Sequence, residues 1–172
     1  MQPVQIRKGT IEDASWLAPL CYQQFKVAHD GAMLPEDLDY CVNMLFNEQS
    51  IKEDLGSTDH QYYVAFSGNE MLGCTKAGAV DLDLGKNEKN ALELTRVYVQ
   101  PEYIGKGVGS ALMRSVIERS KNEGIRSLWL HVYEKNQTAI DFYLKWGFEK
   151  LGKQDYPVRN SCPVGWVMRK KL

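Results

Sequence analysis

The sequence has 172 residues, of which 44% are hydrophobic and 25% are charged, and its formal net charge at pH 7 is −1. These fractions are typical of a globular protein, and the length predicts one domain over residues 1–172 with a hydrophobic core of its own. No apolar run approaches the roughly 20 residues of a membrane-spanning helix, and residues 1–9 do not resemble a secretion signal, so we expect a cytoplasmic protein. A net charge near zero argues against nucleic acids and anionic membranes as partners.

The charges are unevenly distributed along the chain. Residues 27–60 carry eight Asp and Glu against one Lys, whereas residues 100–172 carry thirteen Lys and Arg against seven Asp and Glu. The four cysteines and three histidines are far apart and lack the spacing of metal ligands, so we expect no metal site and predict reduced, mostly buried thiols.

The first 60 residues predict one short strand and then helices. In chain order these are a strand over 4–7, a helix that begins near Thr10 and runs to Ala28, a helix that begins at Pro35 and ends near Phe46, and a short helix over 50–55.

The rest of the chain predicts a sheet interrupted by two helices. The elements are a hairpin of strands 62–66 and 71–80, a loop over 81–90, a strand over 92–99, a helix over 108–122, a strand over 127–133, a helix over 138–146, and strands over 148–151 and 166–169. This alternation of strands and helices predicts an α/β or α+β fold.

A glycine-rich turn separates the strand over 92–99 from the helix over 108–122. Gly105, Gly107 and Gly109 leave backbone N–H groups uncovered, and the start of the helix adds its own free N–H groups and the positive end of its dipole. The turn therefore predicts a site for a phosphate or pyrophosphate. The spacing is neither that of a P-loop nor that of a Rossmann dinucleotide turn. Glycines that serve only to make a tight turn are the alternative.

A second informative stretch runs from residue 128 to residue 148. An apolar strand ends in a polar turn that contains Asn136, and the helix that follows presents Ala139, Phe142 and Tyr143 before it breaks at Gly147. An Asn here can bond an amide-rich ligand, and a Tyr hydroxyl can donate a proton. Alternatively, Asn136 caps the helix and Tyr143 belongs to the core.

The two stretches in this order resemble the acetyl-CoA-binding half of the GNAT N-acetyltransferase superfamily. The segments around Glu93, residues 96–99, residues 129–136 and residues 139–143 are similar to PaiA-like polyamine acetyltransferases. The resemblance implies a central mixed, mostly antiparallel sheet, twisted, splayed at the cofactor site and flanked by helices. Residues 92–148 would form the acetyl-CoA-binding core, and residues 1–60 would form the helices on the acceptor side. The turn departs from the family pattern at Ile104, where Gln or Arg is usual.

The resemblance also implies roles for individual residues. The backbone of the strand would bind the pantetheine arm, the glycine turn would hold the pyrophosphate, an asparagine would contact the cofactor, and a tyrosine would protonate the leaving thiolate. The residues that match these positions are Val97, Tyr98 and Val99 for the strand, Gly105, Lys106, Gly107, Val108, Gly109 and Ser110 for the turn, Asn136 for the asparagine, and Tyr143 for the tyrosine.

An amine acceptor must lose a proton before it attacks a thioester, since an alkylamine has a pKa of about 10. Glu93 is our first candidate for the base, acting through a water. Alternating side chains would place it on one face with Thr95 and Val97. His131 on the neighbouring strand is the rival candidate, because a histidine has a pKa near neutrality. A reaction without a dedicated side-chain base is the third alternative.

The acidic segment over 27–60 overlaps the helices that wall the acceptor pocket in this superfamily. A negative wall would concentrate polycationic amines, and Asp30, Glu36 and Asp37 lie near the connection between the first two helices. The sequence therefore predicts a small-molecule amine acetyltransferase with spermidine or spermine as acceptor. The alternatives are acetylation of a protein or peptide amine, and a non-catalytic acyl-CoA-binding module. Homodimers are common in the superfamily, but the sequence specifies no interface.

Overall fold

A computed structural model of the chain describes residues 3–85 and 87–172. Its helices are α1 (Ala14–Ala28), α2 (Pro35–Leu45), α3 (Glu48–Gly56), α4 (Val108–Asn122) and α5 (Gln137–Lys145), with short 3-10 turns at Ile11–Asp13 and Pro101–Tyr103. The strands are β1 (Gln5–Lys8), β2 (His60–Ser67), β3 (Glu70–Gly78), β4 (Ala91–Val99), β5 (Ser127–Tyr133), β6 (Glu149–Asp155) and β7 (Val164–Lys171).

The seven strands form one sheet in the order β1-β2-β3-β4-β5-β7-β6. All neighbouring strands are antiparallel except β4 and β5, which are parallel. The predicted fold class is therefore confirmed: the sheet is mixed, mostly antiparallel and flanked by helices. The parallel pair lies in the middle of the sheet, where the connection through α4 joins the two halves.

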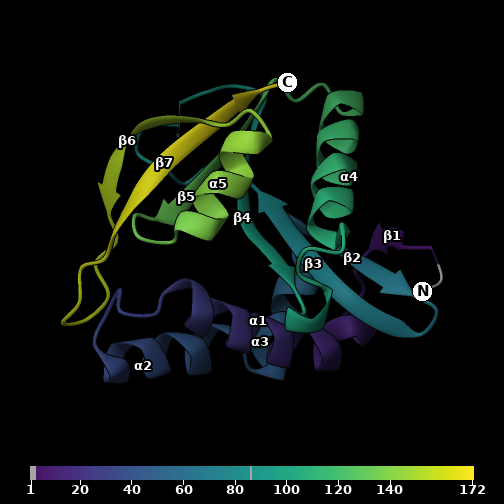
Figure 1. The fold of residues 1–172 in the computed structure, drawn as a ribbon, viewed down its shortest axis with the longest axis horizontal. Helices are drawn as coiled ribbons and strands as arrows, with labels where there is room; N and C mark the ends of the chain where they lie inside the picture. The colour runs from purple at the N-terminus through teal and green to yellow at the C-terminus, as the bar shows by residue number, and fades with distance from the viewer. Residues whose placement is uncertain (1–2, 86) are drawn as a thin grey trace.

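Helices cover both faces of the sheet (Figure 1). Alternation along β2 shows the arrangement, because Tyr62 packs with Leu17 of α1 and Ile51 of α3, whereas Tyr63 packs with Met113 of α4 and Leu128 of β5. Apolar side chains therefore fill two cores, one beneath α1–α3 and the other beneath α4 and α5. The N-terminal helices lie on the side of the sheet opposite to α4 and α5.

The elements with a clear apolar period lie where the sequence predicts them, and the last two strands are longer than predicted. β6 begins at Glu149 and reaches Asp155, with no fully buried residue among its seven. An edge strand of this kind pairs with β7 through its backbone and shows no apolar alternation, so the pattern of side chains hides its length. In the described part of the chain, no helix combines the length and apolar character needed to cross a bilayer.

Candidate active site

The glycine-rich turn before α4 adopts a backbone that favours glycine. Gly105 and Gly107 have φ angles of +78° and +86°, a left-handed region that costs other residues about 1–2 kcal/mol. A Cβ atom at either position would meet no heavy atom within 4 Å. Glycine is therefore favoured here by conformation and not by lack of space. Gly107 is the N-cap of α4, and the first turn of α4 contains no acidic residue.

The start of α4 has the properties of an anion site. Among the described residues, no hydrogen-bond acceptor is found for the backbone N–H groups of residues 108–110. These groups and the helix dipole favour a phosphate at this point. The other residues predicted for the cofactor turn all lie here: Lys106, Val108, Gly109 and Ser110. Ile104 is 60% exposed, so the departure from the family pattern sits at the surface and leaves the N–H groups unchanged.

β4 and β5 separate beside this turn. Their ladder joins only residues 91–93 to residues 127–129, although β4 continues to Val99 and β5 to Tyr133. From residue 94 to residue 99, β4 pairs only with β3 among the described strands. The backbone edge of residues 97–99 that faces away from β3 is therefore available to a ligand. This is the splay that the sequence predicts at the cofactor site.

A bulge interrupts β4 within the splay. Leu94 and Arg96 pair with adjacent residues of β3, so Thr95 has no partner there. Thr95 is exposed at the point where the strands part. The sequence analysis did not single out Thr95 as a site residue, because a β-branched residue inside an apolar strand carries no signal of a bulge.

The bulge reverses the alternation of side chains along β4. Leu94 and Val97 both pack in the core beneath α4 and α5, and Tyr98 packs against the core beneath α1–α3. Strict alternation places Glu93 on the same face as Val97, and this prediction is wrong. The extra residue shifts the register, so Val97 shares the face of Leu94 instead.

Glu93 lies at the point where the two strands part. It is the last residue of β4 that pairs with β5, opposite Trp129, and only 8% of it is exposed. Its Oε2 accepts a hydrogen bond from the backbone N–H of Asp81 at 2.9 Å. Burial raises the pKa of Glu93 above the ordinary value; the N–H of Asp81 opposes this shift and the negative charge of Asp81 adds to it. A carboxylate with a raised pKa is a stronger base than an exposed one.

His131 lies on β5, and one of its ring nitrogens is hydrogen-bonded to the backbone. Its Nε2 lies 3.3 Å from the carbonyl oxygen of Gln154. A carbonyl only accepts, so Nε2 carries the hydrogen and Nδ1 is the ring nitrogen left for proton transfer. Burial lowers the pKa of His131, which keeps the ring neutral.

Tyr156, just beyond β6, is a second residue that the sequence analysis missed. Its ring stacks on that of His131, with centroids 5.6 Å apart and an interplanar angle of 23°. Burial raises the pKa of Tyr156, and the nearby negative charge of Glu93 adds to the shift. Tyr156 is thus close to both candidate bases. One aromatic residue in a polar segment gives no periodic pattern that could have revealed it.

Tyr143 lies on α5, and Asn136 is the residue just before this helix. The ring of Tyr143 packs edge-on against Phe142 and Phe148 at 5.5 and 5.6 Å. Burial raises the pKa of Tyr143 well above the ordinary value, so its hydroxyl stays protonated and can donate. Asn136 accepts a hydrogen bond from the N–H of Ala139 at 3.2 Å and so caps α5.

A comparison with known families fits this arrangement. The acetyltransferase (GNAT) family matches residues 24–148, a span that contains the glycine turn, the splayed strands and α5. The chain belongs to the GNAT acetyltransferase family. It is therefore an acetyl-CoA-dependent N-acetyltransferase, and the uncovered N–H groups at the start of α4 fit the pyrophosphate of that cofactor.

Individual relatives are similar along almost the whole chain. A spermidine N(1)-acetyltransferase of Thermoplasma acidophilum is 25% identical over 98% of this chain and 97% of its own. An uncharacterized N-acetyltransferase of Mycobacterium tuberculosis is 27% identical over 93% and 98%, respectively.

Solved structures share the fold. The crystal structure of PaiA N-acetyltransferase from Thermoplasma acidophilum in complex with coenzyme A has a TM-score of 0.80 at 23% identity and covers 99% of this chain and 100% of that one. The ribosomal-protein-S18-alanine N-acetyltransferase from Escherichia coli has a TM-score of 0.69 at 19% identity and covers 98% of this chain and 94% of that one.

The three acidic residues predicted on the acceptor side of this GNAT enzyme have different environments. Asp30 and Glu36 are exposed near the connection between α1 and α2. Asp37 is 0% exposed, and its carboxylate accepts hydrogen bonds from the segment between β6 and β7. The expectation that Asp37 binds the acceptor directly is therefore corrected, because its oxygens do not reach solvent.

Several other acidic side chains of the segment over 27–60 already have cationic partners. Asp39 lies 2.8 Å from Lys26, and Glu48 lies 2.7 Å from Lys52. Four of the eight acidic side chains of this segment, namely Asp37, Asp39, Glu48 and Asp54, thus have cationic partners among the described residues.

Asp54 of α3 forms the densest ionic cluster of the described residues. Its carboxylate lies 2.6 Å from Nζ of Lys76, 3.2 Å from Arg96 and 2.9 Å from His60, and it accepts a hydrogen bond from the hydroxyl of Tyr62 at 2.7 Å. The cluster joins α3 to β2, β3 and β4 beneath the bulge. Arg96 follows the bulged residue directly, so its ion pair holds this part of β4 in place.

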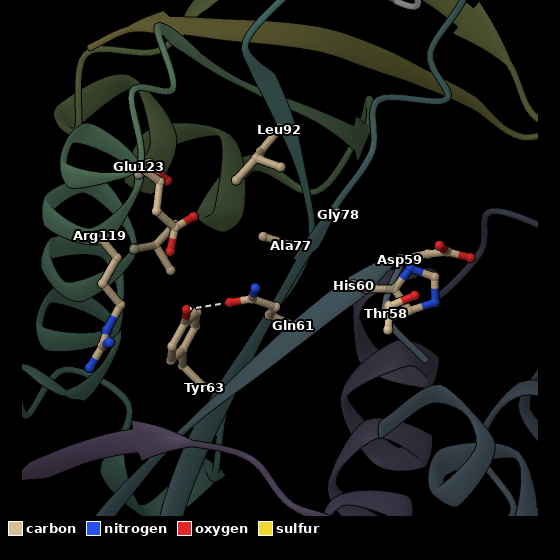
Figure 2. Close-up of a pocket in the computed structure, with 12 residues that line it drawn as sticks. Thr58, Asp59, His60, Gln61, Tyr63, Ala77, Gly78, Leu92, Arg119 and Glu123 are labelled. Atoms are coloured by element: carbon tan, nitrogen blue, oxygen red, sulfur yellow. Dashed lines mark hydrogen bonds between the residues drawn. The ribbon is translucent and has the colours of Figure 1, made fainter. Parts of the chain in front are cut away.

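Two surface cavities lie apart from the residues predicted for the site. One, of about 130 Å³, lies between the second half of α4 and the start of β2 (Figure 2), with Arg119 and Glu123 on the helix and Gln61 and Tyr63 on the strand. The other, of about 340 Å³, lies between α1 and the segment that follows β4. Neither cavity is lined by a residue that the sequence predicts for the site.

Proposed function

We propose that this GNAT enzyme acetylates a primary amine, and that a polyamine such as spermidine or spermine is its acceptor. The observation that carries the proposal is the buried carboxylate of Glu93 at the point where β4 and β5 part, with its raised pKa. Such a group suits the removal of a proton from an ammonium ion beside a thioester. Similarity to a spermidine N(1)-acetyltransferase over 98% of the chain supports a polyamine as acceptor.

The proposed cofactor contacts follow from the two uncovered sets of backbone groups. The turn over residues 105–110 holds the pyrophosphate through the uncovered N–H groups of residues 108–110, and the free edge of residues 97–99 bonds the pantetheine arm. Asn136 contacts the cofactor while it caps α5, since an amide oxygen can accept a second hydrogen bond. Bound acetyl-CoA supplies an activated acetyl group at the splay.

The proposed proton transfers use Glu93 and Tyr143. An alkylamine is almost fully protonated at neutral pH, and Glu93 accepts that proton through a water molecule. Tyr143, whose pKa burial raises, donates a proton to the sulfur that leaves. His131 is the rival base through its Nδ1, since its Nε2 hydrogen is directed at a backbone carbonyl.

The partial neutralisation of the acidic side chains on the acceptor side supports a second candidate, a protein or peptide amine. Asp37 is buried, and Asp39 and Asp54 have cationic partners. A less acidic wall attracts polycations less strongly and tolerates a neutral peptide.

An assay of thiol release from acetyl-CoA with a panel of amines separates these candidates. The panel contains spermidine, spermine, free amino acids and peptides with a free N-terminus. We expect the highest kcat/KM with a polyamine. A higher kcat/KM with a peptide would replace the first acceptor class with the second, and binding of CoA without turnover of any amine would contradict both.

A further inference from the structure

Asp37 makes contacts that neither the cofactor nor the proton transfers use. Its Oδ2 accepts hydrogen bonds from Oγ of Ser161 at 2.7 Å and from the backbone N–H of Asn160 at 3.2 Å. Nε of Arg159 lies 3.7 Å from its other oxygen. All three partners lie in the turn between β6 and β7, more than 120 residues further along the chain. A buried carboxylate of the first turn of α2 therefore ties this helix to the C-terminal hairpin.

Ser161 also completes the start of α2. The residue at the N-cap of α2 is Leu34, whose side chain cannot accept a hydrogen bond. The backbone N–H of Leu34 instead donates to Oγ of Ser161 at 2.9 Å. One hydroxyl thus accepts from the start of the helix and donates to Asp37, and both side chains are buried.

The turn that carries Ser161 is itself well defined. Val158 and Ser161 exchange two backbone hydrogen bonds of 2.8 Å each. Arg159 has a φ angle of +48°, and its guanidinium lies 4.9 Å from the centre of the Tyr40 ring on α2. Figure 1 shows the loop between β6 and β7 reaching down to the start of α2.

Tyr156 stands at the base of the same hairpin loop. Its N–H donates to the carbonyl of Pro163 at 2.8 Å, its ring stacks on His131, and the negative charge of Glu93 adds to the burial that raises its pKa. The contact between Asp37 and Ser161 therefore ties the hairpin loop that Tyr156 opens to the start of α2.

We propose that the contact between Asp37 and Ser161 is a latch that sets the acceptor pocket, and that Asp37 is a positioning residue that acts through Tyr156. The ring of Tyr156 offers an aromatic face to a primary ammonium group beside Glu93. The proposal rests on the proposed function, because the pocket it describes is that of the amine.

Steady-state kinetics with spermidine and acetyl-CoA test the latch. Ser161→Ala removes the bridging hydroxyl and is expected to raise the KM for spermidine about 10- to 150-fold, the range that corresponds to one lost hydrogen bond to a charged group. The KM for acetyl-CoA stays unchanged, since residues 97–110 do not contact the latch. Asp37→Asn, which keeps the size of the side chain, raises the same KM, and Ser161→Thr, which keeps the hydroxyl, restores it.

Two further variants separate positioning from stability. Ser50→Ala removes a hydroxyl from the first turn of α3, where it donates to the carbonyl of Met44 at 2.9 Å; it is expected to lower the melting temperature and leave the KM for spermidine unchanged. The double variant of Ser161→Ala with Tyr156→Ala is expected to raise that KM no further than Tyr156→Ala alone, because the latch acts through the tyrosine.

Three outcomes would overturn the latch while leaving the proposed function intact. They are additive effects on KM in the double variant, an unchanged KM for spermidine in Ser161→Ala, and an equal rise in the KM for acetyl-CoA in that variant. A wild-type protein that binds CoA and acetylates no amine would overturn the proposed function, and the latch with it. The two failures are therefore distinguishable by the activity of the wild-type enzyme.

Discussion

Gly107→Ala separates the need for a particular backbone conformation from the need for space at the cofactor turn. Gly107 has a φ angle of +86°, and a Cβ atom there would meet nothing within 4 Å. The substitution therefore adds no clash. Its cost arises only because alanine disfavours the left-handed region, by about 1–2 kcal/mol.

The structure offers a matched control at the other end of the same helix. Gly124 follows the end of α4 with a φ angle of +77°, and a Cβ atom there also meets nothing within 4 Å. Gly124→Ala is thus expected to cost a similar 1–2 kcal/mol, which in a chain of this length lowers the melting temperature by about 2–8 °C. Both variants are expected to lose stability, as measured by thermal unfolding without ligand.

Only Gly107→Ala is expected to weaken the binding of CoA. If the turn relaxes away from φ +86°, the N–H groups of residues 108–110 no longer point together, and the loss of one hydrogen bond to a charged phosphate costs about 1.5–3 kcal/mol. This corresponds to a Kd for CoA about 10- to 150-fold higher, measured by titration calorimetry. Equal affinity for CoA in both variants would refute the assignment of this turn to the pyrophosphate.

Three other substitutions test the site and the ionic cluster. Glu93→Gln is expected to lower kcat about 100-fold or more at neutral pH. In the wild type, kcat/KM should rise as the pH passes the raised pKa of Glu93, because the basic form predominates above that pKa. A pH profile of thiol release should show that the variant has lost this rise. Tyr143→Phe keeps the ring packing and is expected to lower kcat while leaving the KM for acetyl-CoA unchanged; an unaltered kcat would remove Tyr143 from the role of acid. Asp54→Asn leaves two largely buried cations without a counter-charge, so it is expected to lower the free energy of unfolding by about 3 kcal/mol, measured with urea. The control Glu48→Gln, at an exposed ion pair, should lower it by less than about 0.5 kcal/mol. Equal losses of stability in the two variants would contradict the importance of the cluster.

The parts of the fold that sequence reasoning predicts well are those with local causes. α4 follows from its apolar period between two glycines, and the glycine turn follows from the need for positive φ angles at Gly105 and Gly107. These determinants lie within one element and its ends. Family resemblance then supplied the mixed, mostly antiparallel character of the sheet and its splay, which periodicity alone does not define.

The parts that were missed depend on partners far along the chain. Asp37 in the first turn of a predicted helix looks like a solvent-exposed acid, and only the fold brings Ser161 to it. The bulge at Thr95 has no local signal, because it appears only in the pairing of β4 with β3. The full length of β6 depends on its pairing with β7, since its own residues are almost all exposed.

The capping of α2 by Ser161 has a consequence for the order in which the chain folds. α2 has eleven residues, which is below the length at which isolated helices are stable in water. Its start is completed by a hydroxyl that is synthesised more than 120 residues later. We therefore expect the start of α2 to become ordered only when the hairpin of β6 and β7 docks on it. The helix α2 and the hairpin of β6 and β7 are then expected to become ordered together.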